Sequence, residues 1–509
     1  MLKNILHSAV QSRAFNRNVS LESFKNKLAS EASVITNSFV KTDSALFMLS
    51  EQDEQTNLVI VSQYERALSG FSGESLTDLE DGITYYAISC PLDNGNACQL
   101  RKSVPHTAPS VLDCRQSFGT GDRIGNPAPA TPWHIEACES FNMPPVLAQQ
   151  SVRENHKTGR TFQQVLDDVT WSVFGCGYTS PWGADADHLK NLEEIEEAAR
   201  VGFTMFTLDP SDMIDNDANT DSDDVLKQKL SGLFENNEEV DAFISRYEGT
   251  NGADARSVVQ SGVTYLAAIR HGVKAYSRLI EQKGGSSFNF EMSIDETSNT
   301  TSVLDHHIIV TELTSAGVNL FSLAPRFEGA FEKGIDYRGD LGEFRRSLEK
   351  HVSLACELGE YRMSLHSGSD KFSIYPAFGE ITDGFFHVKT AGTSYIEALK
   401  AVAQVDIDLF RKILTLSIDT FHENVKSYQI SADVSRIPRV LQLKQDDMLE
   451  LIANDQDTRQ VLHIAYGVVL GRMGEELKAV LRNSREFYRE NVVTHIKKHL
   501  TLLTGISET

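Results

Sequence analysis

The sequence predicts a (β/α)8 barrel of the TIM type, with additional regions before, within and after it. Short apolar runs that end in polar or glycine residues recur eight times between residues 117 and 391, and amphipathic helical patterns lie between several of them. Eight strand–helix units are the number found in such a barrel. A doubly wound open sheet is the alternative, because periodicity does not show whether a sheet closes on itself.

The eight candidate strands lie near residues 117–124, 145–151, 177–188, 203–209, 287–295, 318–324, 361–366 and 385–391. Helical periodicity, with apolar residues three or four positions apart, separates several of them. It runs through Thr161–Phe174, Leu192–Val201 and Leu341–Leu358. Together these elements predict a catalytic barrel at residues 111–400.

Three segments depart from this alternation. Residues 1–110 are predicted to form an N-terminal cap or a small α+β subdomain, with a hairpin between Ala45–Met48 and Leu58–Ser62. A helical insertion is expected after the fourth strand, at about residues 211–285. Residues 401–509 lack strand alternation, and we expect a C-terminal helical region that completes the barrel or packs on it.

Composition narrows the classes of partner and the compartment. The 509 residues carry a formal net charge of −23, which argues against nucleic acid as a partner because phosphates attract a basic surface. The six cysteines are scattered along the chain and form no C-x-x-C pair, as is typical of a protein in a reducing compartment. The N-terminus has no apolar stretch of the length of a secretory signal, and no apolar run is long enough to cross a membrane. We therefore expect a cytoplasmic protein without a membrane or nucleic-acid partner; the sequence indicates no oligomeric state.

Polar residues gather at the ends of the last four predicted strands. Glu291, Ser293 and Asp295 alternate with apolar neighbours, so one face of that strand is polar. The residues that end the following three runs are Arg326, His366 and Lys389. Parallel α/β scaffolds build their sites from residues at strand ends. The sequence therefore predicts a site at this edge of the barrel.

A metal site is the first hypothesis for that edge. His188, Glu291 and His366 fall at the ends of the third, fifth and seventh predicted strands, and alternate strands contribute side chains to one layer of a barrel. Imidazole and carboxylate ligands suit a divalent transition metal such as zinc, nickel, manganese or iron. Asp187 is an alternative or additional ligand, because strand alternation places Asp185 and Asp187 on one face and His188 on the other. The competing interpretation is that each histidine is only hydrogen-bonded near a strand end.

Two further groups of polar residues complete the predicted site. Arg326, Lys333, Ser367, Ser369 and Lys371 come from two successive strand-end loops and could grip an anion, since arginine binds carboxylates with two hydrogen bonds. The alternative is that these residues have a structural role, in a salt-bridge network with nearby aspartates.

The residues predicted to supply acid–base chemistry are Asp122, Asp295 and Lys389. A buried lysine can act as a base or form a Schiff base, and pairing with a carboxylate is the alternative. A dinucleotide site is not indicated, because F-G-T-G-D-R-I-G contains G-x-G-x-x-x-G and not the phosphate-binding spacing.

Several longer motifs occur in an order typical of one family. They are G-D-R-I-G (121–125), T-P-W-H-I (131–135), Q-Q-S-V-R-E (149–154), T-G-R-T (158–161), G-A-D-A-D-H-L-K (183–190) and G-F-T-M-F-T-L-D-P (202–210), followed by the strand-end stretches described above. Over about residues 118–431 the chain resembles the tagaturonate/fructuronate epimerases, hexuronate-ketose epimerases of bacterial sugar-acid catabolism. It departs from the pattern after Gly125, where N-P-A-P-A replaces an apolar segment, and over the first hundred residues.

The resemblance implies a metal-dependent isomerase that interconverts D-tagaturonate and D-fructuronate. It also strengthens the metal assignment of His188, Glu291 and His366. With it we assign Gln150 to substrate binding beside Arg326, Lys333, Ser367 and Lys371, and Asp187 to catalysis beside Asp122, Asp295 and Lys389.

The expected reaction inverts C4 of a 2-ketose. The proton on C4 is β to the carbonyl and is not acidified by it, so retro-aldol cleavage of C3–C4 and re-addition on the other face is the favoured route. Two acid–base groups would handle the proton of the C4 oxygen, one for each epimer. The alternatives are a metal-dependent aldolase or isomerase on a related ketose acid, and a non-catalytic sugar-acid-binding protein.

Overall fold

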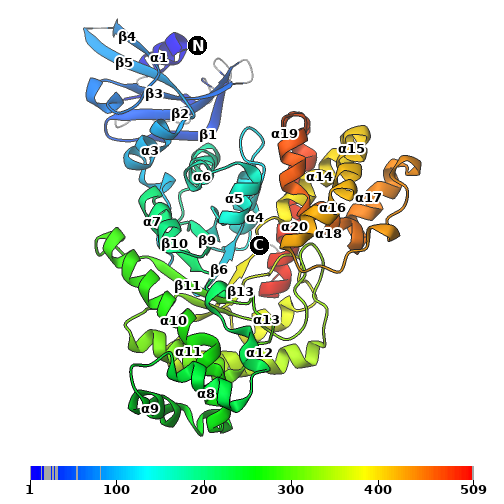
Figure 1. Cartoon of the computed structure of the whole chain (residues 1–509). Helices are drawn as coiled ribbons and strands as arrows, with labels where there is room; N and C mark the ends of the chain where they lie inside the picture. Colours follow the sequence, from blue (N-terminus) through cyan, green and yellow to red (C-terminus); the bar gives the residue numbers. More distant parts are fainter. Residues whose placement is uncertain are drawn as a thin grey trace. The chain divides into compact units, whose positions relative to one another are not determined.

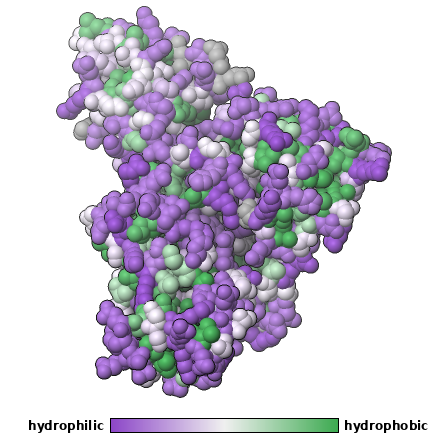
Figure 2. All heavy atoms as spheres, viewed as in Figure 1, coloured by the Kyte–Doolittle hydropathy of each residue, from purple (hydrophilic) through white to green (hydrophobic). Residues whose placement is uncertain are grey.

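The computed structural model describes residues 2–12, 14–15, 24–25, 28, 33–52, 55–80 and 82–506. The chain forms two compact units (Figure 1). The first comprises Met1–Pro109 with Gln163–Pro181, and the second comprises Ser110–Phe162 with Trp182–Thr509. The face shown in Figure 2 is mostly hydrophilic, as the large net charge leads one to expect.

The first unit is built on a five-stranded antiparallel sheet in the order β1-β2-β3-β5-β4. Its elements are α1 (Leu2–Gln11), β1 (Val34–Lys41), β2 (Ala45–Gln52), β3 (Gln55–Ser62), β4 (Glu74–Glu80), β5 (Ile83–Pro91), α3 (Asn94–Ser103) and most of α6 (Phe162–Cys176). Alternating residues of β2 serve two cores: Leu46 and Met48 pack with α1, while Phe47 and Leu49 pack with Trp171 of α6. The antiparallel pairing of β2 with β3 confirms the predicted hairpin, whose residues 53 and 54 lie outside the described residues.

The second unit contains a curled sheet of nine short strands, all parallel, in the order β7-β6-β14-β13-β12-β11-β10-β9-β8. The strands are β6 (Gln116–Gly119), β7 (Pro145–Val146), β8 (Gln150–Ser151), β9 (Asp185–Leu189), β10 (Met205–Leu208), β11 (Asn289–Ile294), β12 (Ser322–Pro325), β13 (Arg362–Leu365) and β14 (Phe386–Lys389). Each predicted strand range overlaps one of them, and the range 145–151 contains two, β7 and β8.

The two ends of this strand order come from the same stretch of chain. β7 pairs with β6, and β8 pairs with β9, yet only residues 147–149 separate β7 from β8. Within this stretch the Leu147 N–H donates to the Gly183 carbonyl at 2.9 Å, and the Gly183 N–H donates to the Pro145 carbonyl at 2.9 Å. The segment is therefore hydrogen-bonded to both β6 and the residues that lead into β9.

Helices follow most of the strands. They are α4 (Thr131–Glu139), α5 (Val152–Thr158), α7 (Leu192–Val201), α10 (Ala255–Lys283), α11 (Val303–Ser315), α12 (Leu341–Leu358), α13 (Tyr375–Ile381) and α14 (Thr393–Val405). The bounds of α7 and α12 are those that periodicity predicts. After β10, α8 (Asp223–Ser231) and α9 (Asn237–Tyr247) pack on the long α10, within the range predicted as a helical insertion (Figure 1).

The end of the chain is helical, as predicted. It forms α15 (Ile407–Asp419), α16 (Phe421–Asn424), α17 (Gln445–Asn454), α18 (Gln456–Ile464), α19 (Tyr466–Asn483) and α20 (Arg485–Thr504). α20 packs against α4, α13 and α14, so the last helix contacts helices that follow strands of the parallel sheet (Figure 1). In the part of the chain that the structure describes, no helix is both long and apolar enough to cross a membrane.

One contact of α20 gives a stability prediction. A Cβ on Gly379 in α13 would lie 1.8 Å from the Leu503 carbonyl oxygen. Gly379→Ala should therefore lower the free energy of unfolding by roughly 1–3 kcal/mol, because the backbone of one helix must move. Gly471→Ala in α19 is the matched control: nothing lies within 4 Å of its Cβ position, and we expect a gain of up to about 1 kcal/mol. Chemical denaturation measures both, and equal effects would contradict the contact.

Candidate active site

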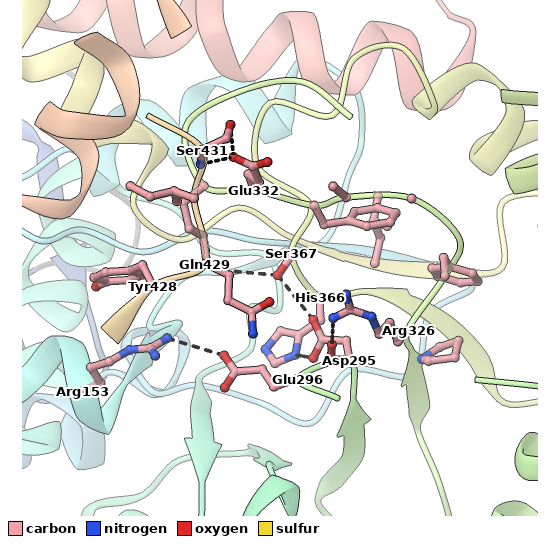
Figure 3. Close-up of a pocket in the computed structure, with 18 of the residues that line it drawn as sticks. Arg153, Asp295, Glu296, Arg326, Glu332, His366, Ser367, Tyr428, Gln429 and Ser431 are labelled. Carbon is pink, nitrogen blue, oxygen red and sulfur yellow. Dashed lines mark hydrogen bonds and ion pairs between the residues drawn. The ribbon is translucent and has the colours of Figure 1, made fainter. Parts of the chain in front are cut away.

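A pocket of about 670 Å³ lies at the carboxyl ends of β11, β12 and β13 (Figure 3). Its polar lining includes Arg153, Asp295, Glu296, Arg326, Lys333, His366, Ser367, Tyr428 and Gln429. A smaller adjoining space shares Arg153, Lys333, His366, Ser367 and Tyr428 with it, and adds Asp187, His188 and Lys389. We call the two together the strand-end pocket. It joins the ends of β9, β11, β13 and β14 with α5 and the segment before α17.

Three side chains in this pocket form a group that could hold a metal ion, and His188 also forms a second such group with Asp209 and Glu296. Asp187, His188 and His366 each offer one ligand atom, and these atoms lie within 4.8 Å of one another. His366 Nε2 is 2.9 Å from Asp187 Oδ1. The His188 and His366 rings are stacked, with centroids 4.3 Å apart. The predicted pairing of His188 with His366 is therefore present, and Asp187 joins them.

The backbone conformation of His188 explains why the side chains of Asp187 and His188 lie on the same side of the strand. His188 has a φ of +51°, and the pairing of β9 with β10 is irregular between Phe206 and Leu208. A left-handed residue interrupts the alternation of side chains along a strand. Asp187 and His188 therefore both reach the pocket. Strand alternation would have placed only one of the two side chains there.

His366 lies between two carboxylates. Its Nδ1 is 3.1 Å from Asp295 Oδ1 and 2.5 Å from Ser293 Oγ, and its Nε2 faces Asp187. Burial would lower the pKa of His366, but Asp295 and Asp187 outweigh burial and raise the pKa to about 10. Asp295 is also held by Ser293 Oγ at 2.6 Å and keeps a 15% exposed side chain toward the pocket.

Lys389 is a buried counter-ion. Its Nζ lies 2.8 Å from Asp185 Oδ2, 3.0 Å from Asp187 Oδ1 and 3.0 Å from Glu291 Oε1, and its side chain is 0% exposed. Burial opposes the charged form, but the three carboxylates raise its pKa above that of an ordinary lysine. Burial in turn raises the pKa of Asp185 to about 6. A lysine held protonated in this way is a poor nucleophile, so the structure favours the carboxylate pairing over the Schiff base.

Glu291, the remaining predicted metal ligand, lies apart from the three grouped ligand atoms. Its carboxylate lies beside Lys389 and accepts a hydrogen bond from Ser322 Oγ at 2.5 Å. Glu291 precedes Asp295 by four residues, which is roughly 13 Å of extended chain, and Asp295 contacts His366 at the strand end. Glu291 therefore lies deeper in the sheet than the ligand group.

The donor set fits a divalent transition metal. Asp187, His188 and His366 supply oxygen and imidazole nitrogen, which suit such ions. The carboxylates of Asp185, Asp187 and Glu291 are buried and that of Asp295 is partly exposed, whereas Lys389 and His366 are their cationic neighbours. Buried negative charge in excess requires compensation, which a bound cation would provide.

Three other predicted residues are placed by the structure in supporting positions. The Asp122 carboxylate accepts hydrogen bonds from the backbone N–H groups of Ile124, Gly125 and Ala130 before α4, and Asp122 does not line the strand-end pocket. Lys371 borders the smaller space, but its Nζ donates to the carbonyls of Glu332, Ile335 and Ser369 at 2.7–2.9 Å. Gln150 is buried beside Arg160 at 3.3 Å, and its neighbour Gln149 lines the smaller space instead. Asp122, Lys371 and Gln150 thus hold loops and neighbouring side chains in place.

The remaining predicted residues do converge. Arg326 Nη1 donates to the Asp295 carbonyl at 3.3 Å, Lys333 Nζ donates to Ser367 Oγ at 3.3 Å, and Ser367 Oγ donates to Asp295 Oδ2 at 3.3 Å. All four line the strand-end pocket, and Figure 3 labels Arg326, Ser367 and Asp295. The predicted cationic groups therefore surround the strand end that carries Asp295.

Sequence reasoning missed several residues of this pocket. Arg153 and Glu296 occur in or beside quoted motifs and carry charge, so their types were a usable signal. Tyr428 and Gln429 follow α16 in the C-terminal region, and no pattern in the sequence connects them with the strand ends. Asp209 was quoted in a motif only, and its carboxylate lies 3.3 Å from His188 Nδ1.

A second histidine cluster surrounds Asp370, whose neighbours Ser369 and Lys371 line the smaller space. Asp370 Oδ1 is 2.6 Å from His495 Nε2, Asp370 Oδ2 accepts from Arg459 at 3.3 Å, and the Asp370 N–H donates to His499 Nε2 at 3.2 Å. Because these atoms already bond to one another, the cluster links the loop after β13 to α18 and α20.

Comparisons with known proteins agree with one another. The family model described as UxaE, tagaturonate epimerase, matches residues 35–503. The tagaturonate/fructuronate epimerase of Thermotoga maritima is 40% identical over 494 residues, which cover 95% of this chain and all of the relative. Two crystal structures of the fructuronate-tagaturonate epimerase UxaE from Cohnella laeviribosi, one native and one with a glycerol, are 33% identical with TM-scores of 0.85. The alignments cover 94% and 95% of this chain and 98% and 99% of those chains.

Proposed function

This chain belongs to the tagaturonate epimerase family, and we propose from that membership that it interconverts D-tagaturonate and D-fructuronate with the help of a divalent transition metal ion. The observation that carries the proposal is the strand-end pocket itself. It places Asp187, His188 and His366 beside the cationic groups of Arg153, Arg326 and Lys333. One side of the pocket therefore suits a cation and the other suits an anionic sugar.

We propose that the parallel sheet closes as a (β/α)8 barrel. Counting β7 and β8 as one strand gives eight, and the hydrogen bonds of the 145–151 segment to both neighbours support closure. The proposed organisation keeps a cap at residues 1–110, the barrel at 111–400 and a helical region at 401–509. We also propose a cytoplasmic location, which the six free cysteines favour.

Asp187, His188 and His366 are the residues that would hold the metal, whose identity we limit to zinc, nickel, manganese or iron. When bound, such an ion supplies Lewis-acid stabilisation of negative charge that develops on substrate oxygens. The protein's own part is to hold these ligands. Lys389 fixes Asp187, and Asp295 fixes the ring of His366 through Nδ1.

We propose that inversion at C4 proceeds by retro-aldol cleavage of C3–C4 and re-addition to the other face of the aldehyde. Asp295 is the carboxylate best placed to accept the proton of the C4 hydroxyl. It lines the pocket, and its side chain is partly exposed there. Of the other carboxylates assigned to catalysis, Asp187 is paired with Lys389 and His366, and Asp122 caps a loop.

The proposed reaction has a direct test. Purified protein loaded with one of the four metals is incubated with tagaturonate, and the products are followed by NMR. Fructuronate should accumulate to an equilibrium ratio that is also reached from fructuronate. Free three-carbon fragments as the main product would favour the aldolase alternative, and binding without conversion by metal-loaded protein would favour a binding protein.

Arg326 gives a prediction about substrate binding. Arg326→Ala should raise the KM by roughly 10- to 150-fold, because a charged hydrogen bond to a substrate oxygen contributes roughly 1.5–3 kcal/mol. Its effect on folding should be small, since among the described residues its guanidinium donates only to the Asp295 carbonyl, at 3.3 Å. Steady-state kinetics and thermal melting separate the two. An unchanged KM with a lower melting temperature would assign Arg326 to structure.

A further inference from the structure

We propose that Arg153 binds the carboxylate of the sugar acid, and that Glu296 is the internal carboxylate that the substrate replaces. The inference rests on the proposed function, since it takes a hexuronate as the ligand. The sequence favours Arg326 as the residue that binds the substrate carboxylate. The structure instead points to Arg153 on α5, which the sequence did not single out.

Arg153 and Glu296 form a loose ion pair at the edge of the strand-end pocket (Figure 3). Arg153 Nη2 is 3.6 Å from Glu296 Oε1, and the two side chains are 34% and 37% exposed. Half-exposed pairs of this kind are weak because water competes for both partners. A second carboxylate can therefore take the place of Glu296 without a large loss.

Glu296 lies near both Arg153 and the ligand group. Its Oε1 is 3.6 Å from Arg153 Nη2 and 4.0 Å from His188 Nδ1, so the arginine and histidine nitrogens are less than about 8 Å apart. Arg153 and His188 also line the same space. A sugar acid that replaces Glu296 at Arg153 therefore lies next to the ligand group.

An aromatic ring supports the Arg153 guanidinium, whereas Arg326 contacts a different part of the pocket. Arg153 lies over the Tyr428 ring at 5.0 Å, and Tyr428 is fixed in turn by a hydrogen bond between its hydroxyl and that of Tyr466 at 3.3 Å. A planar guanidinium supported on a ring suits bidentate binding of a carboxylate. Arg326 and Lys333 instead point to the Asp295 carbonyl and to Ser367, where sugar hydroxyls would lie.

The inference predicts opposite effects for the two partners of one ion pair. Arg153→Gln should weaken fructuronate binding by roughly 10- to 150-fold, because a charged hydrogen bond is lost. Glu296→Gln should strengthen it by roughly 1.5- to 5-fold, because a competing carboxylate is removed. A pair that served only structure would lose affinity in both variants.

The experiment is calorimetric titration of the metal-loaded wild type, Arg153→Gln, Glu296→Gln and the matched control Arg326→Gln. Each is titrated with fructuronate and with fructose, in which CH2OH replaces the carboxylate. We expect the affinity ratio of fructuronate to fructose to fall in Arg153→Gln, to rise in Glu296→Gln and to change little in Arg326→Gln. Arg153→Lys should recover part of the ratio, and thermal melting verifies that each variant is folded.

Three results would overturn the inference: an unchanged ratio in Arg153→Gln, a weaker fructuronate affinity in Glu296→Gln, or a selective loss in Arg326→Gln. Calorimetry needs no turnover, so this test is separate from the test of epimerisation. Epimerisation with an unchanged ratio removes only the assignment of Arg153. A wild type that does not bind fructuronate overturns both proposals.

Discussion

His366→Ala is expected to remove most of the bound metal and to lower epimerisation by more than two orders of magnitude, while the fold persists. His366 contributes Nε2 to the group formed with Asp187 and His188. Removing a residue that only orients a ligand costs roughly 10- to 100-fold in metal affinity or activity, so removing a ligand should cost more. The fold should survive because the parallel sheet retains its large apolar core.

Metal analysis after loading with zinc, nickel, manganese or iron measures the first effect, and NMR turnover measures the second. Asp187→Asn should behave like His366→Ala, whereas Glu291→Gln should keep its metal, because Glu291 lies with Lys389 and Ser322. His156→Ala, an exposed histidine on α5, controls for the loss of an imidazole. Full activity after exhaustive chelation, with metal verified absent, would end the metal hypothesis.

The positions of the strands could be predicted because the signal is local. Most strands of the parallel sheet are short apolar runs that stop at polar or glycine residues, and all eight predicted ranges overlap observed strands. The same logic located His366, Arg326 and Ser367, since residues at strand ends must emerge at one edge of a parallel sheet. Helical periodicity likewise gave the bounds of α7 and α12.

The depth and direction of single side chains could not be predicted in this way. Glu291 and Asp295 share a face, but only the register of β11 with its neighbours shows that Glu291 is buried beside Lys389. The positive φ of His188 interrupts the alternation of side chains along the strand, and no residue type in the sequence predicts this φ. Asp122 resembles a strand-end acid in sequence, yet its carboxylate is used by three backbone N–H groups. Tyr428 reaches the pocket only through long-range packing.

Lys389→Met is expected to lower the free energy of unfolding by roughly 3–5 kcal/mol and to disrupt the metal site. The substitution leaves Asp185, Asp187 and Glu291 buried without their common cation, and breaking a buried ion pair by removing one partner has a cost of this size. Lys412→Met is the matched control, because its pair with Glu476 is half exposed and should be worth at most about 1 kcal/mol. Denaturant unfolding in the presence of a chelator compares the two without a bound metal.

The dependence on pH gives Lys389→Met a second, more specific signature. In the wild type, Lys389 holds the pKa values of Asp187 and Glu291 below their ordinary values against the effect of burial, so their contribution to stability is present above about pH 4 and is lost as the pH falls further. In the variant, burial and mutual repulsion act alone and raise the carboxylate pKa values, and Asp185 already titrates at about 6 with the lysine present. A raised carboxylate pKa contributes stability at low pH that is lost as the pH rises. The wild type also gains stability as the pH falls from 8 to 5, because the pKa values of Asp185 and His366 are raised. Metal-free Lys389→Met should gain more than the wild type over this range, because more of its carboxylates have raised pKa values. A gain no larger than that of the wild type would show that Lys389 is not the counter-ion of these carboxylates.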